Sequence, residues 1–296
     1  MTTGKSLAYH SSSIVSNFNR KGKTMIIDKL NELNEIVNSS NIPDAKFPWG
    51  MHDIGFIDKL PKKQENGFYP DPEYIVTPYS RKISWLMEQL NPAWFGMKDV
   101  ATDRYEFFIP IMDAVREALK QDPDASSESL CHVILTTAEK AVAKTVTEAV
   151  CNGVSNPDGL HIYFAYGSNM NMEQMEERCP GAIKLGNATL PGYKLVERDT
   201  ADIDVSENDV VYGVLFAISS AHLKKLDKHE GLLKGIYDRK QIKVQIGDGH
   251  GVAIVYEMTP ETKRDRDGKP YRPGYREKCS LGAQQHGVQN GFACNS

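Results

Sequence analysis

A run of turn-forming residues at positions 152–159 divides this sequence of 296 residues into two parts with different hydrophobic patterns. Before the run, apolar residues recur every three or four positions, which is the spacing of amphipathic helices. After it, they gather into short runs rich in β-branched and aromatic side chains, which is typical of strands. We therefore predict an α+β protein in two parts. The predicted boundaries are a flexible N-terminus at 1–24, a helical domain at 25–152, a linker at 153–159 and a second domain at 160–296.

The first part contains segments with a helical period. The predicted helices are residues 25–38, 81–90, 105–121 and 126–150. The last is the strongest, because Ser126, Ser127 and Glu128 supply helix-capping chemistry at its start. Its predicted apolar stripe is Leu130, Val133, Ile134, Thr137, Ala141 and Val142. No motif indicates what this part does, so three roles stay open: coverage of an active site, formation of a homodimer, and recognition of a carrier protein or a biosynthetic intermediate.

Composition and charge exclude several classes of protein. A formal net charge of -4 gives no reason to expect binding to nucleic acid. No apolar run approaches the roughly 20 residues of a membrane span, so no membrane contact is predicted. Five widely spaced cysteines favour free thiols in a cytoplasmic protein, with no zinc site. Residues 1–24 carry bases, serines and no acid, so targeting to an organelle through this segment is the alternative.

The most informative stretch of the second part is 162–174, where an apolar strand leads directly into Tyr-Gly-Ser-Asn. Residues 162–165 alternate as a strand does. Gly167 is free to take a positive φ and leaves its N–H unobstructed. Asn171, with Gln174 three positions later, predicts a helix N-cap and a reciprocal capping box. A strand, a glycine loop and a helix start point several backbone N–H groups at one spot, which suits an anionic or carbonyl ligand.

Further elements follow from the hydrophobic pattern and its turn residues. They are a strand at 210–216, a helix at 219–229 that ends at Gly231, a hairpin with strands at 240–246 and 251–256, and a helix at 275–286. The charged run 263–269 has mixed sign. We interpret it as a solvated loop tip, and a lid over an anionic substrate is the alternative.

Several motifs follow one another in the second part. They are Tyr166-Gly167-Ser168-Asn169, Val211-Tyr212-Gly213-Val214-Leu215-Phe216, Leu226-Asp227-Lys228-His229-Glu230-Gly231, Tyr237-x-Arg239, and Pro273-x-Tyr275 ahead of Leu281-Gly282-Ala283. In this order they resemble the γ-glutamylcyclotransferase-like family, over Leu160 to Val288 and less than half of the chain. A lone Tyr-Gly-Ser-Asn would be weak support, but the ordered set is specific. The resemblance implies a small mixed β-barrel for residues 160–296.

The resemblance also implies a reaction. In this family the α-amine of a γ-glutamyl amide attacks the γ-carbonyl of the same molecule, which releases 5-oxoproline and a free amine. One carboxylate of suitable pKa can take a proton from the ammonium group and give it to the leaving nitrogen. By resemblance Glu230 is this general acid and base, and no metal or cofactor is needed. The implied partner is a small-molecule γ-glutamyl substrate.

The resemblance places five further residues at the substrate: Tyr166, Gly167, Ser168, Asn169 and Tyr275. N–H groups of the loop would hold a carboxylate or a tetrahedral oxyanion. The two tyrosines are either pocket walls with hydroxyl donors or core residues whose hydroxyls are already bonded. Ser168 lies in no Gly-x-Ser-x-Gly motif, so we favour a hydrogen-bonding role over a nucleophilic one.

Two more residues are candidates. His229 stands where the family commonly has an aromatic residue, and it either tunes Glu230 or lies at the surface. Arg239 either pairs with a substrate carboxylate or, as we favour, forms a salt bridge on a strand face. Two other functions stay open. They are a non-catalytic module that binds a γ-glutamyl ligand, and an amide lyase or hydrolase that acts on a biosynthetic intermediate.

Overall fold

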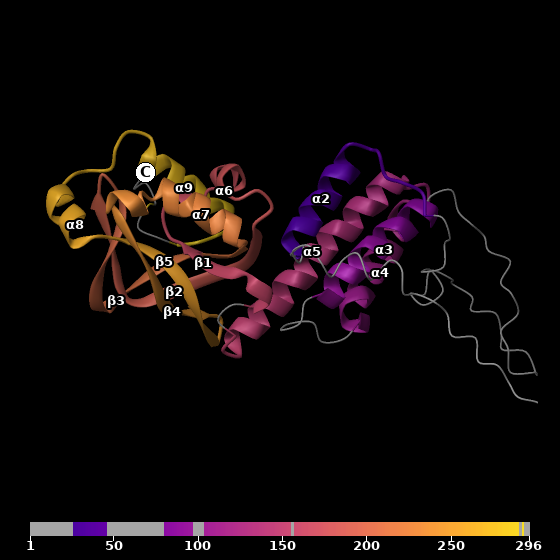
Figure 1. Ribbon diagram of the computed structural model, residues 1–296, viewed down its shortest axis with the longest axis horizontal. Coiled ribbons are helices and arrows are strands. Elements are labelled where there is room, and N and C mark those ends of the chain that lie inside the picture. Colours follow the sequence, from indigo (N-terminus) through magenta and orange to yellow (C-terminus); the bar gives the residue numbers. More distant parts are fainter. Residues whose placement is uncertain (1–25, 46–79, 97–103, 155–156, 290–291, 293–296) are drawn as a thin grey trace, which may run out of the picture.

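The structure is a computed structural model that describes residues 26–45, 80–96, 104–154, 157–289 and 292. Figure 1 shows a group of helices on the right and a β-barrel on the left, connected by one long helix. We refer to residues 26–154 as the helical part and to residues 157–292 as the barrel part. The predicted flexible N-terminus, 1–24, lies outside the described residues.

Helices are present at each position of the helical part where the apolar period predicts one. They are α2 (Ile26–Asn38), α3 (Ser80–Gly96), α4 (Arg104–Gln121) and α5 (Ser127–Cys151). Ser126 is the N-cap of α5, and its side chain accepts a hydrogen bond from the N–H of Ser129. Local cap chemistry therefore fixes where this long helix begins.

The buried face of α5 differs from the predicted stripe. Val133, Thr137 and Ala141 are only partly buried. Residues outside the predicted stripe are buried instead, namely Cys131, Leu135, Ala138 and Val146. A hydrophobic period indicates the more apolar side of a helix, but α5 packs against α2, α3 and α4. Its neighbours therefore decide which side chains are covered.

Five strands close into a barrel of mixed direction, as the resemblance predicts. They are β1 (His161–Ala165), β2 (Ile183–Arg198), β3 (Thr200–Ile218), β4 (Tyr237–Ile246) and β5 (Gly249–Met258). The order around the barrel is β1-β3-β2-β4-β5. The neighbours are antiparallel except β1 and β5, which are parallel. The predicted strand at 210–216 and the predicted hairpin at 240–256 are both part of this barrel.

The hairpin of β2 and β3 is the longest feature of the barrel, with strands of 16 and 19 residues. The sequence pattern predicts only the second half of β3 and none of β2. Gly186, Pro191 and Gly192 interrupt the apolar pattern of β2, and two register shifts beside them absorb the interruptions. The hairpin turns at Asp199, which has a φ of 63°. Asp is one of the few residues that tolerate this conformation in a turn.

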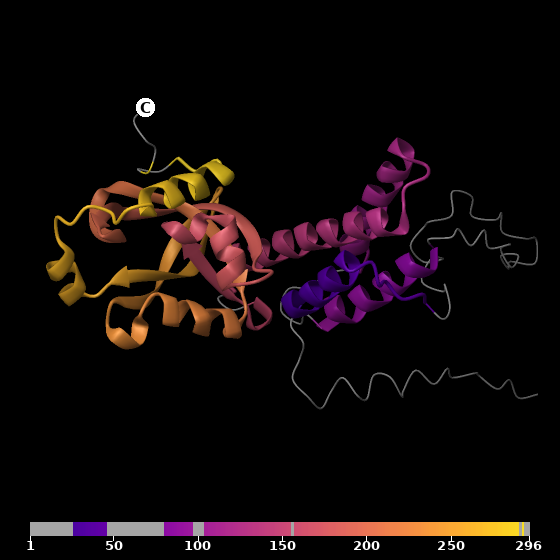
Figure 2. The same ribbon diagram turned by 90° about the horizontal axis from the view of Figure 1, so that it is seen from above.

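Helices and short 3₁₀ turns surround the strands. They are α6 (Met172–Arg178), α7 (Ser220–His229), α8 (Pro260–Arg266), α9 (Tyr275–Gln285), η2 (Pro157–Gly159), η3 (Ser168–Met170) and η4 (Leu232–Lys234). α7 has Ser219 as its N-cap and, as predicted, ends before Gly231, which takes a φ of 69°. α8 lies at the end of the barrel far from the helical part (Figure 2).

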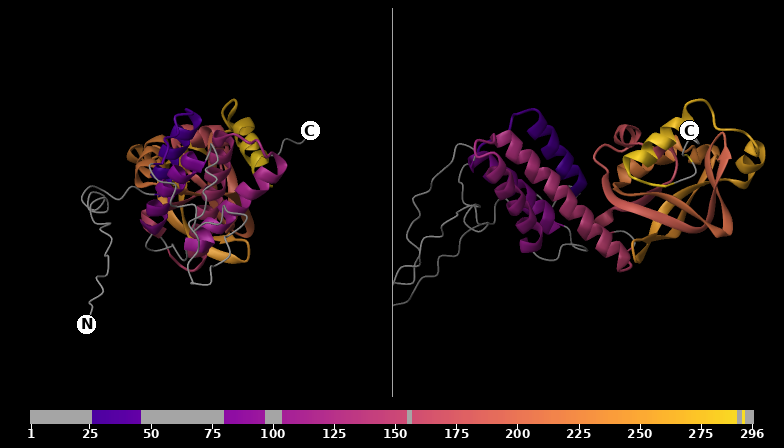
Figure 3. Two further views of the ribbon diagram at one scale, coloured as in Figure 1. Left: turned by 90° about the vertical axis from the view of Figure 1, so that its right-hand side faces the viewer. Right: turned by 180° about the vertical axis from the view of Figure 1, so that it is seen from behind.

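The helical part meets the barrel at the end opposite α8 (Figure 3). Val150 near the end of α5 packs so closely on the start of β5 that a Cβ at Gly251 would lie 2.3 Å from its Cγ1. On the other side of the junction, Asn31 Nδ2 donates a hydrogen bond of 3.0 Å to the carbonyl of Pro180. The two parts are therefore in direct contact at this end of the barrel.

Two expectations from composition can be compared with the described residues. No described helix is both long and apolar enough to cross a lipid bilayer. Cys131, Cys151, Cys179 and Cys279 are free thiols, as predicted. Cys294 lies outside the described residues.

Candidate active site

A pocket of about 140 Å³ opens at the end of the barrel that carries α8. Its walls come from β1, β3, β4 and β5, from η3, and from the ends of four helices. No described residue of the helical part lines it. The pocket brings together these residues of the predicted site: Tyr166, Gly167, Ser168, Asn169, His229, Glu230 and Tyr275.

Glu230 is the C-cap of α7, and its side chain is 17% exposed. Asn169 Nδ2 donates a hydrogen bond of 3.0 Å to its Oε1, and Arg178 Nη1 lies 3.6 Å from the same oxygen. Burial raises the pKa of the Glu230 carboxyl, while Arg178, Asn169 and Arg272 act in the opposite direction. A carboxyl with a raised pKa is better matched to proton transfer near neutral pH than an exposed one.

The side-chain amide of Asn169 is bonded at both ends. Its Oδ1 accepts hydrogen bonds from Arg178 Nη1 at 2.6 Å and from Gln174 Nε2 at 2.9 Å. Its Nδ2 donates to the hydroxyl of Tyr163 at 2.7 Å and to Glu230. Because a guanidinium group can only donate, Oδ1 must face Arg178. The NH₂ group of Asn169 therefore faces Glu230.

Gln174 forms only half of the predicted capping box. Asn171 Oδ1 accepts the N–H of Gln174 at 2.9 Å, as predicted. The side chain of Gln174, however, turns toward the loop and donates to Ser168 Oγ at 2.8 Å and to Asn169. Buried polar atoms need partners, and this amide supplies them to two buried residues of the loop. Gln174 therefore contributes to the helix cap through its N–H and to the pocket loop through its side chain.

Gly167 is needed for space and not for an unusual backbone angle. Its φ is −119°, so it does not use the positive φ that the sequence allows. A Cβ at this position would lie 2.9 Å from the hydroxyl of Tyr275 and 3.1 Å from the Cβ of Ala201. A side chain would therefore require the Tyr275 hydroxyl to move and would press closely on Ala201.

The loop keeps several backbone donors unused. The N–H groups of Met170 and Asn171 close η3 by bonding to the carbonyls of Gly167 and Ser168. Among the described residues, none of the hydrogen bonds in loops and turns uses the N–H of Gly167, Ser168 or Asn169. Since these three residues line the pocket, their N–H groups can serve a carboxylate or an oxyanion there.

Both tyrosines of the predicted site are buried. The hydroxyl of Tyr166 donates to the carbonyl of Tyr256 at 2.5 Å, so this residue is a wall whose hydroxyl is already bonded. Burial raises the pKa of Tyr275, whose hydroxyl lies beside Gly167 and Ser168. No histidine among the described residues bonds to Ser168, whose hydroxyl accepts a hydrogen bond from Gln174.

The structure places His229 and Arg239 differently. His229 lies at the pocket, and partial burial lowers its pKa. Arg239 lies on β4 outside the pocket, with its Nη1 3.0 Å from Asp227 Oδ2. Asp227 also accepts a hydrogen bond of 2.7 Å from the hydroxyl of Tyr256. Arg239 therefore occupies the strand-face salt bridge and does not reach the pocket.

Three arginines that line the pocket have no place in the predicted site: Arg178, Arg266 and Arg272. They come from the end of α6, the end of α8 and the segment before α9. The guanidinium carbon of Arg272 lies 5.4 Å from the centre of the Tyr275 ring. Of the three, only Arg178 could have been proposed as a site residue from the sequence, because it lies on the short helix that directly follows the Tyr-Gly-Ser-Asn loop.

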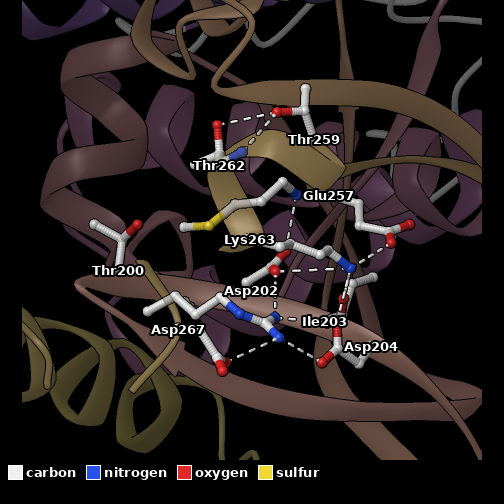
Figure 4. A network of polar contacts seen from close by, with 12 residues as sticks. Thr200, Asp202, Ile203, Asp204, Glu257, Thr259, Thr262, Lys263 and Asp267 are labelled. Atoms are coloured by element: carbon white, nitrogen blue, oxygen red, sulfur yellow. Dashed lines mark hydrogen bonds and ion pairs between the residues drawn. The ribbon is translucent and has the colours of Figure 1, made fainter. Parts of the chain in front are cut away.

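A network of ion pairs joins the turn of the β2–β3 hairpin to β5 and α8 (Figure 4). Arg198 lies 2.7 Å from both Asp202 Oδ2 and Asp204 Oδ2. Lys263 Nζ lies 2.8 Å from Asp204 Oδ1 and 2.6 Å from Glu257 Oε1. Asp202 is fully buried, so its charge depends on these partners.

This network supports one wall of the pocket. Thr200 and Ala201, which line the pocket, lie in the chain between Arg198 and Asp202. The hydroxyl of Tyr237 holds the same segment, 2.8 Å from Thr200 Oγ1 and 2.8 Å from the carbonyl of Ala201. The ion pairs of Arg198 and Asp202 and the hydrogen bonds of Tyr237 together hold Thr200 and Ala201 in place.

Most of the charged run 263–269 is exposed, as predicted for a solvated tip, but Lys263 and Arg266 are partly buried and form ion pairs. Its first half belongs to α8, where Lys263 is held by the acids of β3 and β5. Arg266 lines the pocket and lies 3.4 Å from Asp199. Mixed charge in the sequence here reflects ion pairs with distant strands, which a local pattern cannot distinguish from a solvated loop.

Comparison with known proteins identifies the barrel part. The model of the family "Gamma-glutamyl cyclotransferase, AIG2-like" matches residues 163–275, the segment that supplies every residue lining the pocket. Gamma-glutamylcyclotransferase from Mus musculus is 30% identical over 152 residues, which cover 47% of this chain and 78% of that protein. The chain belongs to this family.

Two further proteins are similar to the same part of the chain. The gamma-glutamylcyclotransferase of Bos taurus is 29% identical over 152 residues, with the same shares of both chains covered. A crystal structure of an uncharacterized protein from Homo sapiens is 28% identical, covers 44% of this chain and 82% of that one, and has a TM-score of 0.38. The family extends over the barrel part, and the helical part lies outside the matched segment.

The pocket combines one carboxylate with several cationic side chains. Glu230 is the one carboxylate among the described lining residues, and three arginines share the pocket with it. No group of three or more His, Cys, Asp or Glu side chains in the described residues is arranged to hold a metal ion.

Proposed function

We propose that this protein is a γ-glutamyl amide cyclotransferase, which converts a γ-glutamyl amide into 5-oxoproline and a free amine. The observation that carries the proposal is the setting of Glu230. Its carboxyl has a raised pKa, accepts a hydrogen bond from Asn169, and lies in the same pocket as a loop with unused N–H groups. Membership of the γ-glutamyl cyclotransferase family supports the same reaction.

The chemistry needs one proton carrier. The Glu230 carboxylate takes a proton from the substrate α-ammonium group, and the freed amine attacks the γ-carbonyl carbon. A new C–N bond closes the five-membered ring. The ring nitrogen of the tetrahedral intermediate loses its remaining extra proton to solvent. The intermediate then collapses, the original amide C–N bond breaks, and Glu230 gives its own proton to the leaving nitrogen. One residue acts as base and then as acid, which works best when its pKa lies near the working pH.

Charge that develops on the carbonyl oxygen requires donors that are already in place. The N–H groups of Gly167, Ser168 and Asn169 belong to residues that line the pocket, and no described loop or turn bond uses them. Fixed donors of this type lower the barrier because they do not have to reorient during the reaction. We assign the oxyanion to this loop.

The substrate carboxylate needs a cation. Arg178 faces Glu230, and Arg266 is paired with Asp199. Among the described residues, Arg272 forms no ion pair within 4.0 Å, and it lies over the Tyr275 ring at the pocket. We assign the substrate carboxylate to Arg272, because guanidinium groups suit carboxylates in geometry and charge.

The size of the cavity limits what enters it. At about 140 Å³ it is similar to an engineered cavity of about 150 Å³ that admits benzene. A γ-glutamyl group fills such a space, so the amine on the far side of the amide extends through the mouth. Residues at the mouth, such as His229, then contact the amine that leaves.

A product assay tests the proposal. The purified protein is incubated with a panel of γ-glutamyl amino acids and γ-glutamyl amines, and 5-oxoproline is measured by mass spectrometry. We expect 5-oxoproline from at least one compound. The matched N-acetyl compound should give none, because its α-nitrogen can no longer attack. Glutamate as the product would indicate a hydrolase, and binding without turnover across the panel would indicate a ligand-binding module.

A further inference from the structure

We propose that Arg178 and Gln174 are positioning residues, which select the orientation of the Asn169 amide so that its NH₂ group meets Glu230. Arg178 in addition places a positive charge opposite the same carboxylate. This inference rests on the proposed role of Glu230 and deepens it. Neither residue touches the reacting atoms in the mechanism above, so both act through Asn169 and Glu230.

The Asn169 amide has two orientations, and its neighbours exclude one of them. A guanidinium group has only donors, and an ionised carboxylate has only acceptors. If the amide were flipped, its NH₂ group would face Arg178 and its oxygen would face Glu230, which are two repulsive contacts. In the observed orientation both contacts are hydrogen bonds, of 2.6 Å to Arg178 and 3.0 Å to Glu230.

Burial makes this selection effective. Asn169 is 4% exposed and Gln174 is 7% exposed, so water cannot easily replace a lost partner. Gln174 Nε2 also donates to Ser168 Oγ, which connects the first turn of α6 to two residues of the loop. A shift of α6 would therefore move the loop and the amide together.

The charges around Glu230 show why Arg178 matters most. Arg178 faces it from α6, Arg272 from the segment before α9, and Arg266 from the end of α8, with His229 next to it in the chain. The other titratable groups among the described lining residues are neutral phenols: Tyr163, Tyr166, Tyr237, Tyr256 and Tyr275. Arg178 lies 3.6 Å from Glu230, the one salt bridge of this carboxylate among the described residues.

Loss of this charge has a definite sign. Burial raises the pKa of Glu230 and Arg178 opposes that rise, so removal of the Arg178 charge raises the pKa further. The reaction begins with ionised Glu230. The acid limb of the pH profile of kcat/KM should therefore move to higher pH.

Three variants separate charge from orientation. Arg178→Gln removes the charge and keeps a donor, Arg178→Lys keeps the charge, and Gln174→Met removes the amide at similar size. The matched control is Arg264→Gln on α8, because Arg264 is exposed and lies outside the pocket. Each variant is measured by the pH profile of kcat/KM and by NMR titration of ¹³C-labelled glutamate carboxyls, in which Glu230→Gln assigns the signal.

We expect Arg178→Gln to raise the midpoint of the Glu230 titration by about one unit or more, which is the usual effect of a nearby opposite charge. Arg178→Lys should restore most of the shift. Gln174→Met should leave the midpoint close to that of the native protein. It should lower kcat on the order of 10- to 100-fold with little change in KM, because the carboxylate is misplaced.

The NMR titration needs no substrate, so it stands apart from the proposed reaction. If no γ-glutamyl compound gives 5-oxoproline but Arg178→Gln still moves the midpoint, the reaction is wrong and the role of Arg178 holds. A midpoint in Arg178→Gln equal to that of Arg264→Gln would overturn the role of Arg178. Native kcat in Gln174→Met would overturn the role of Gln174.

Discussion

The two ends of the barrel part are held by different kinds of contact. At the end that meets the helical part, Val150 packs closely on Gly251. At the other end, which carries the pocket, Arg198 and Lys263 are bound to a group of carboxylates (Figure 4). The first end is held by close packing and neutral hydrogen bonds, and the second by ion pairs between distant segments.

Because of this difference, we expect changes at the two ends of the barrel part to affect folding and turnover differently. The helical part contributes no described residue to the pocket, so a weaker helical core should change folding without changing the reaction. The ion pairs stand behind Thr200 and Ala201, which are a wall of the pocket. A change there should affect both folding and turnover.

The largest effect is expected from Arg198→Met at the pocket end. It leaves the buried carboxylate of Asp202 without its guanidinium partner, and breaking a buried ion pair costs about 3–5 kcal/mol. We expect a loss of this size in the free energy of unfolding, measured with urea, and a lower kcat/KM while the protein is still folded. Arg264→Met, at an exposed position, should stay within about 0.5 kcal/mol of the native protein. Equal stability of the two variants would contradict the comparison.

Leu33→Ala tests the other side of the comparison. Leu33 of α2 is fully buried, and such a truncation costs about 2–5 kcal/mol. We expect a lower melting temperature but an unchanged kcat/KM well below it. Glu35→Ala on the exposed side of α2 is the control. A proportional loss of activity in folded Leu33→Ala would show that the helical part does act on the pocket.

Arg272→Gln tests the binding of the substrate carboxylate. Loss of a charged hydrogen bond costs about 1.5–3 kcal/mol, so KM should rise on the order of 10- to 100-fold. The value of kcat should change much less, because the contact is present before and during the reaction. Steady-state kinetics of 5-oxoproline release measure both. An unchanged KM would remove Arg272 from this role.

The smallest expected effect is on the stability of the fold at acidic pH. Hydrogen bonds from Arg198 lower the pKa of Asp204 from 3.8 to about 2. Because the folded pKa is depressed, the contribution of Asp204 is complete above its unfolded value and is lost as the pH falls through about 2. Since this carboxylate is partly exposed, about 1 kcal/mol is involved. Urea titrations of Asp204→Asn between about pH 4 and pH 2 should show a flatter fall in stability than the native protein. An equal dependence of stability on pH in the variant and the native protein would contradict the proposed contribution of Asp204.

The comparison also explains which parts of the fold were predictable. α7 and the β4–β5 hairpin carry their own caps, turns and periods, so a local pattern is enough. β2 was missed because Gly186, Pro191 and Gly192 weaken its pattern, and only pairing with β3 stabilises it. The buried stripe of α5 differs from the predicted one, because the positions of the neighbouring helices determine which of its side chains are covered.

The site shows the same division. Glu230 and the loop at 166–169 lie in motifs that a sequence can show, and the structure brings them to one pocket. Arg178, Arg266 and Arg272 lie far apart in the chain and meet only in the folded barrel. Even Gln174, whose cap position was predicted, has a side-chain contact that depends on the buried loop.

Glu230→Gln tests the central claim most directly. The best γ-glutamyl substrate of the panel is used, with Glu261→Gln on the exposed face of α8 as a control. We predict that substrate binding, measured by calorimetry, stays similar while kcat for 5-oxoproline falls by about 10²- to 10⁴-fold, the usual contribution of a general acid and base. Native turnover in Glu230→Gln would contradict the assignment of the proton carrier, whatever the family of the chain.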